Sequence, residues 1–271
     1  MIQLQNIKLA RQPDERSAKY PFNVPIVRAL AERDLVFKTP VTFFVGENGS
    51  GKSTMLEAIA CAAHAITVGS DGVEHDATLD AVRLLARALK LSWRAKRQRG
   101  FYMRSEDFFG FVKWTRDTRA AYERELSEVD AEFAHRSETA RNYTRLPFLK
   151  ELGALKQRYG DDLDAHSHGE TYFKLFGARF VPNGLYLLDE PEAPLSPMRQ
   201  LGLLTMIKTQ VEEHSSQFVI ATHAPILLAY PGATIYSFDG GAIKTVAYDD
   251  LEHVQFTRAF LANPQRYLRH L

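Results

Sequence analysis

The 271-residue sequence has a single cysteine, Cys61, so no disulfide can form within the chain. It also lacks any run of about 18 or more apolar residues, the length that a membrane-spanning helix requires. Its first twenty residues mix charged and apolar side chains and contain no signal-peptide core. Together these absences predict a protein of the reducing cytoplasm with no membrane segment of its own.

Net charge is nearly absent as well. The 34 Lys and Arg residues against 33 Asp and Glu leave a formal charge of +1, so no overall field attracts nucleic acid or an anionic membrane. Such binding would need a local patch. The stretch WRAKRQRGFYMR, residues 93–104, combines basic and aromatic side chains without an acid and could hold phosphates and stack bases. A solvated basic face explains the same composition.

Short apolar runs alternate with helical segments along most of the chain. The predicted strands lie in IQLQNIKL, PVTFFV, GLYLLDE, SQFVIATHAP and ATIYSFDG, and the predicted helices in STMLEAIACAAHAI and SPMRQLGLLTMIKTQVEEH. Alternation of this kind predicts an α/β fold with a mostly parallel, buried sheet and helices packed on it.

The middle of the chain, from about residue 80 to 160, is charged and is predicted to be helical. Tyr122, Leu126, Val129 and Phe133 form one apolar stripe. A short coiled-coil arm is one interpretation, but only about two heptads are present, which favours a helix packed on its own lobe. We therefore expect one domain, residues 1–271, with a helical lobe inserted at about residues 80–165.

The segment GENGSGKST fits the pattern G-x-x-x-x-G-K-[ST] between a predicted strand and a predicted helix, the context that a phosphate-binding loop requires. Backbone N–H groups of such a loop surround phosphates, the lysine reaches the β and γ oxygens, and the serine hydroxyl binds Mg²⁺. The predicted nucleotide-binding residues of this loop are Gly46, Glu47, Asn48, Gly49, Ser50, Gly51, Lys52, Ser53 and Thr54.

Two further predicted strands end in residues suited to catalysis. After GLYLL, Asp189 is expected to hold Mg²⁺ with Ser53, and Glu190 to orient or deprotonate the attacking water. After FVIAT, His223 is expected to leave its strand at the same edge of the sheet and to contact the γ-phosphate. The predicted catalytic residues are thus Lys52, Glu190 and His223.

The stretch HSHGETYFKLF, residues 166–176, has two interpretations. Ser167 and Glu170 have the spacing of a helix capping box, which would only start a helix. A helix N-terminus also presents unpaired N–H groups and positive dipole, which suit an anion, and Gly169 permits close approach.

These motifs, in the order phosphate loop, SHGE, LLDEPE and ATHAP, resemble those of the ATP-binding-cassette (ABC) ATPases, and nearly the whole chain takes part in the resemblance. It is most similar to stand-alone members with SMC-like or repair-type catalytic cores. The resemblance implies ATP and Mg²⁺ as cofactors. It also implies an ATP-dependent homodimer in which Ser167, Gly169 and Glu170 meet the γ-phosphate bound by the partner's phosphate loop.

The sequence departs from the family pattern in several places. The signature reads SHGET rather than the LSGGQ typical of transporters, and Ser196 stands where a D-loop aspartate is usual. Ser196 with Pro197 also suits a plain helix start. Gln98 and Glu106 are the candidates for the Q-loop position, and Tyr20 and Phe22 for stacking on adenine.

Three functions remain open at this stage. The first is a stand-alone ATPase in DNA repair or genome defence, which the basic stretch at residues 93–104 would support. The second is the nucleotide-binding subunit of a transporter whose membrane part is another chain. The third is an ATP-dependent regulatory switch, against which the intact Glu190 argues. A small GTPase is excluded because the guanine-reading motif N-K-x-D does not occur.

Overall fold

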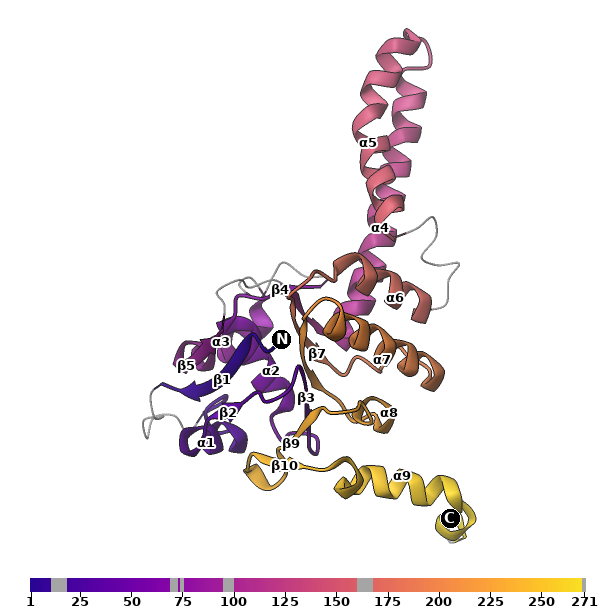
Figure 1. Cartoon of the computed structure of the whole chain (residues 1–271). Helices are drawn as coiled ribbons and strands as arrows, with labels where there is room; N and C mark the ends of the chain where they lie inside the picture. Colours follow the sequence, from indigo (N-terminus) through magenta and orange to yellow (C-terminus); the bar gives the residue numbers. More distant parts are fainter. Residues whose placement is uncertain (11–18, 69–72, 74–75, 95–99, 160–167, 270–271) are drawn as a thin grey trace. The chain divides into compact units, whose positions relative to one another are not determined.

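The computed structural model describes residues 1–10, 19–68, 73, 76–94, 100–159 and 168–269 (Figure 1). The chain divides into two compact units. The first comprises Met1–Ser105 and Phe180–Leu271, and the second comprises Glu106–Arg179. We describe each unit by itself.

The described part of the first unit contains a seven-stranded sheet in the order β10-β9-β3-β8-β7-β6-β4. Its strands are β3 (Val41–Val45), β4 (Ile66–Thr67), β6 (Gly100–Arg104), β7 (Leu185–Asp189), β8 (Gln217–Ala221), β9 (Thr234–Ser237) and β10 (Lys244–Val246). β10 pairs with β9 antiparallel, and the other neighbours are parallel. β3, β7 and β8 are buried along their whole length, as expected for parallel strands covered on both faces.

A smaller antiparallel sheet in the same unit has the order β2-β1-β5, with β1 at Leu4–Leu9, β2 at Leu35–Val36 and β5 at Leu89–Trp93. The helix α2 (Lys52–Ala62) lies between the two sheets, whereas α7 (Pro197–Glu212) and α8 (Pro225–Leu228) cover the other face of the large sheet (Figure 1). The remaining helices of this unit are α1 (Pro25–Glu32), α3 (Asp80–Ala88), α9 (Glu252–Ala262) and α10 (Gln265–Leu268), with 3₁₀ turns at Ala77–Leu79, Asp239–Gly241 and Tyr248–Asp250.

The main hydrophobic core lies around α2, which is apolar on nearly all sides. Met55 and Ile59 of this helix pack in one cluster with residues of both sheets, including Ile7 of β1, Leu187 of β7 and Val219 of β8. Helix α2 begins directly after the loop at residues 46–51. Burial of the helix therefore fixes where that loop lies.

The second unit is helical and contains α4 (Ser105–Glu132, whose first residue belongs to the first unit), α5 (Glu138–Tyr159) and α6 (His168–Arg179). The second half of α4 runs beside α5 (Figure 1), where the Tyr122 and Phe148 rings lie 6.3 Å apart between centroids. The Asp130 carboxylate forms ion pairs with Arg145 at 3.4 Å and with Arg141 at 3.9 Å. Near the other end, Tyr172 of α6 packs against Phe108 of α4.

The α/β fold class with a mostly parallel sheet is confirmed. The boundaries of the helical unit differ from the expected 80–165, because β5 and β6 are strands of the first unit and α6 belongs to the second. Of the apolar stripe, Val129 is buried and Tyr122 packs toward α5. Tyr122 of the stripe thus contributes to the packing of α4 against α5.

Candidate nucleotide-binding site

The loop between β3 and α2 has the backbone of a phosphate cradle. Gly46, Gly49 and Gly51 have φ values of 145°, 83° and 97°. Gly51 immediately precedes α2 in the left-handed conformation, where a Cβ would lie 2.5 Å from the Val24 side chain. Glycine is therefore required there for steric reasons as well as conformational ones. The first turn of α2 leaves N–H groups without helical partners, which suits an anion at this point.

Lys52 is the first residue of α2, and its side chain is buried. Its Nζ donates hydrogen bonds to the backbone oxygens of Gly46 at 2.6 Å and Glu47 at 3.1 Å, so the side chain closes the loop. Burial lowers the pKa of Lys52, and the carboxylates of Glu190, Asp189, Asp239 and Glu192 oppose that shift. The Lys52 ammonium thus lies in the field of several carboxylates. A bound phosphate would add further negative charge beside this ammonium.

Asp189 ends β7 and is buried. Burial raises the pKa of Asp189 to about 6, and a hydrogen bond from the Ser53 side chain opposes that rise. Its Oδ1 has no hydrogen-bond partner among the described residues. A hydroxyl and a carboxylate that meet beside a phosphate loop fit Mg²⁺, which takes one or two protein oxygens and completes its shell with substrate phosphates and water.

Among the residues that the structure describes, no group of three His, Cys, Asp or Glu side chains is arranged to hold a metal ion by itself.

Glu190 follows β7 and is exposed. Its φ of 47° places it in the left-handed region, which is unusual for a side-chain-bearing residue. The N–H of Glu190 donates to the Ala221 carbonyl at 2.9 Å, and its carbonyl accepts from the Ala193 N–H at 3.1 Å. These two hydrogen bonds hold the backbone turn at Glu190, where the chain leaves the sheet. Strained backbone conformations of this kind cluster at functional sites.

β8 lies between β3 and β7 in the sheet. His223, two residues beyond β8, therefore emerges between the phosphate loop and the carboxylates that follow β7. Burial lowers the pKa of His223, and the Lys52 charge lowers it further. The imidazole thus stays neutral near pH 7 and keeps one donor and one acceptor.

Pockets for small-molecule ligands measure about 300–1,000 Å³, and the cleft at the phosphate loop measures about 620 Å³. Its lining includes Asn48, Lys52, Ser53, Thr54, Glu190 and Tyr20. Tyr20 is 48% exposed, and its hydroxyl lies 3.4 Å from the Thr54 hydroxyl. Phe22 instead packs, partly buried, against the core. Of the two aromatic candidates, only Tyr20 lines this cleft.

A family profile described as an AAA domain matches residues 27–145, a segment that includes the phosphate loop. The matched segment spans less than half of the chain. The fold itself is an α/β fold with a mostly parallel sheet and a phosphate loop between β3 and α2. Within the described residues, none of the helices combines the length and the apolarity needed to cross a bilayer.

Solved structures that are similar to this chain include two of different kinds. One is cbiO1 from Clostridium perfringens, part of an ABC transporter complex, with 14% identity, a TM-score of 0.49 and 100% of each chain covered. Another is the Smc head domain from Pyrococcus furiosus, with 12% identity, a TM-score of 0.41 and coverage of 86% of this chain and 95% of that one. At such values neither likeness carries an argument about partners. No curated protein matches the sequence.

Two acidic residues of the candidate site were not identified from the sequence. Glu192 accepts hydrogen bonds at Oε1 from the Thr222 hydroxyl at 2.6 Å and from the His223 N–H at 3.0 Å, so it holds the turn that carries His223. Asp239 follows β9, and its Oδ1 accepts from the Glu47 N–H at 2.7 Å. The signal for Asp239 was present in SFDG, since any residue after a parallel strand of this sheet emerges at the same edge.

Two of the three predicted signature residues belong to the helical unit. Ser167 lies outside the described residues. Gly169 and Glu170 belong to the first turn of α6, within the helical unit. Of the Q-loop candidates, Gln98 lies outside the described residues and Glu106 is the first residue of the helical unit. Ser196 takes the N-cap position of α7, but its side chain makes no capping hydrogen bond.

The basic stretch at residues 93–104 is described only in part, because residues 95–99 lie outside the described residues. Phe101 and Tyr102 are buried in β6, and Trp93 packs against the core. Arg104 forms an ion pair with Asp76 at 2.8 Å. Phe101 and Tyr102 are therefore packed inside the core, and Trp93 packs partly buried against it, so these three rings contribute to the packing of the first unit.

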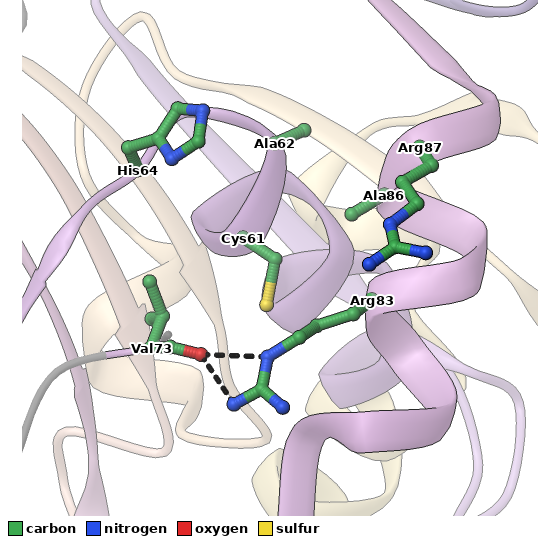
Figure 2. A pocket seen from close by; sticks show the side chains of 7 residues that line it. All are labelled: Cys61, Ala62, His64, Val73, Arg83, Ala86 and Arg87. Carbon is green, nitrogen blue, oxygen red and sulfur yellow. Dashed lines mark hydrogen bonds between the residues drawn. The ribbon is translucent and has the colours of Figure 1, made fainter. Parts of the chain in front are cut away.

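A second hollow, of 390 Å³, lies at the other end of α2 (Figure 2). Cys61, His64 and Arg87 line it with Arg83. The Arg83 guanidinium is already engaged, since it donates to the Val73 carbonyl at 2.8 and 3.0 Å and to the Asp76 carbonyl at 2.7 Å. None of the residues predicted to bind the nucleotide lines this hollow.

Proposed function

We propose that the chain is a cytoplasmic enzyme that binds ATP with Mg²⁺ at the phosphate loop, hydrolyses it, and dimerises around it. The observation that carries the proposal is the convergence of three strand ends. Lys52 after β3, His223 after β8 and the carboxylates after β7 meet at one edge of the parallel sheet, beside a cleft of nucleotide size.

Each residue has a separate task in this proposal. Lys52 and the loop N–H groups bind the β and γ oxygens, and Ser53 with Asp189 hold Mg²⁺, which neutralises charge on the phosphates. Glu190 is exposed to the cleft and takes a proton from the attacking water. His223, neutral and between the two groups, donates a hydrogen bond to the terminal phosphate.

The test is the steady-state rate of ATP hydrolysis with Mg²⁺. Lys52→Ala should abolish turnover, because no other cation of the described loop replaces its charge. Glu190→Gln should lower kcat by about 10²-fold or more while ATP still binds, since the amide keeps size but cannot take the proton. Lys208→Ala, at an exposed lysine of α7, is the matched control and should leave the rate unchanged. Near-normal hydrolysis by Lys52→Ala would refute the proposal.

The proposal names no nucleic acid, because Phe101 and Tyr102 of the basic stretch are buried and Trp93 packs partly buried against the core. It also needs no membrane subunit.

A further inference from the structure

Two histidines from separate elements lie side by side at the phosphate site. His223 follows β8, and His253 lies in the first turn of α9. Their ring centroids are 6.4 Å apart, with an angle of 69° between the rings. Helix α9 contacts α8 and is anchored by Leu251 and Val254, which are both buried. His253 lies between these two anchors, so its place beside His223 is fixed by packing.

Both rings carry an unused hydrogen-bonding atom. Among the described residues, Nε2 of His223 and Nε2 of His253 are each buried and without a partner. A buried imidazole nitrogen without a partner is costly, and most such atoms in proteins are paired, with water if not with protein. Two of them in neighbouring rings indicate a site for one further group that bonds to both.

Charged residues of the phosphate site act on both His223 and His253. Burial lowers the pKa of both histidines, and the Lys52 charge lowers both further. Glu190 opposes the shift at His223, and Asp239 opposes it at His253. Each neutral ring has one donor and one acceptor nitrogen, so the pair is suited to hold a single oxygen atom between them.

We propose that His253 is a positioning residue of the ATP site, which orients the His223 ring through one oxygen atom held between the two Nε2 atoms. The inference rests on the proposed ATPase function. The oxygen is that of a water molecule or of the terminal phosphate. In either case His253 acts on the reaction through His223, and the start of α9 becomes part of the catalytic site.

The first test compares kcat and KM for ATP in variants of His253. His253→Phe keeps an aromatic ring but has no nitrogen, and it should lower kcat by about 10-fold, within the roughly 2- to 150-fold range of couplings between contacting residues. His253→Gln keeps a donor and an acceptor and should retain more of the rate than His253→Phe. His214→Ala is the matched control, because His214 precedes β8 at the opposite edge of the sheet, and it should match the wild type.

The second test is a double-mutant cycle. If His253 acts through His223, then adding His253→Phe to His223→Ala should cause no further loss of kcat. If the double variant instead loses kcat by the product of the two single-variant factors, the inference is wrong. Affinities then identify the oxygen: weaker binding of ATP alone assigns it to the terminal phosphate, and unchanged binding of ATP and ADP assigns it to water.

The two proposals fail in different ways. A wild-type protein that hydrolyses ATP, a dead Lys52→Ala variant and a fully active His253→Phe variant would overturn only the role of His253. A wild-type protein that does not hydrolyse ATP would overturn the proposed function and this inference with it. Thermal unfolding of each variant separates a loss of the fold from a loss of rate, and the milder His253→Gln serves if His253→Phe does not fold.

Discussion

Gly51 is the residue at which the geometry of the phosphate loop is most constrained. Its φ of 97° is strained for any L side chain, and a Cβ would lie 2.5 Å and 2.6 Å from Val24 and Ile26. We expect Gly51→Ala to lower the free energy of unfolding by about 1–3 kcal/mol and to weaken ATP binding, because the loop must shift. Denaturant titration and calorimetry with ATP would measure both effects.

The control for that substitution is Gly153→Ala. Gly153 lies inside α5, where a Cβ meets nothing within 4 Å. Alanine there should stabilise the protein by about 0.5–1 kcal/mol, since it is the better helix former. Equal effects of the two substitutions would contradict the steric role of Gly51.

Cys61 gives a second prediction at this scale. Burial raises the pKa of its thiol to about 11, so at pH 8 only about one thiol in a thousand is ionised and reactive. Iodoacetamide at pH 8 should therefore alkylate the native protein far more slowly than the urea-unfolded protein, as followed by mass spectrometry. Similar rates in both states would show that the thiol is not shielded.

The principal site residues could be predicted from single motifs, whereas their supporting residues could not. Lys52, Asp189, Glu190 and His223 each follow an apolar strand, and the carboxyl ends of parallel strands share one edge. Glu192 and His253 carry no such signal. Their roles depend on which side chains meet in space, and no spacing in the sequence encodes the contact between a strand-end histidine and one at the start of α9.

At the scale of elements, Gln217 joins the two sheets of the first unit. It is the first residue of β8 and is fully buried. Its Oε1 accepts from the N–H groups of Gln3 and Leu4, both at 2.8 Å, and its Nε2 donates to the Leu4 carbonyl at 3.0 Å. One amide side chain thus satisfies three backbone groups at the start of β1.

We expect Gln217→Leu to lower the free energy of unfolding by at least about 2 kcal/mol, because each buried group left unpaired costs about 1–3 kcal/mol. Urea denaturation followed by circular dichroism would measure the change. Gln265→Leu on the exposed surface of α10 is the matched control and should shift stability by less than about 0.5 kcal/mol. A loss for Gln217→Leu no larger than that control would show that the sheets do not depend on this contact.

The sequence predicted strands in apolar runs better than strands in charged stretches. β3, β7, β8 and α2 were predicted because each is an apolar run with Gly, Pro or polar boundaries. β5 and β6 are as long as β3, β7 and β8, but they were missed because they lie within or beside a charged stretch whose average composition is helical. Pairing with β1 and β7 stabilises them, and that information is tertiary.

At the scale of the whole molecule, the expected ATP-dependent dimer has a direct test. Glu190→Gln should bind ATP without turning it over, so the bound γ-phosphate persists and favours the dimer. Light scattering after size exclusion should show a dimer of this variant with ATP and monomer with ADP or without nucleotide. A variant that stays monomeric at saturating ATP would contradict the proposed dimer.

A second substitution tests whether the signature residues contribute to the dimer. Ser167→Arg, added to Glu190→Gln, should return the protein to monomer, because it places bulk at the expected contact with the partner's ATP. Loss of a helix cap costs about 0.5–2 kcal/mol, which should leave the monomer folded. A dimer that survives the added arginine would mean that SHGE is only a capping box.

The position of the helical unit in the chain also bears on how the protein folds. β6 and β7 pair side by side in the large sheet, yet Glu106–Arg179 lies between them in sequence. Pairing these strands requires closure of that long segment, whose entropic cost grows with its length. Helices α4 and α5 form through local contacts and shorten the segment as they form. We therefore expect the pairing of β6 with β7 to be a slow step in the folding of the large sheet, since contacts between residues far apart in sequence lower folding rates.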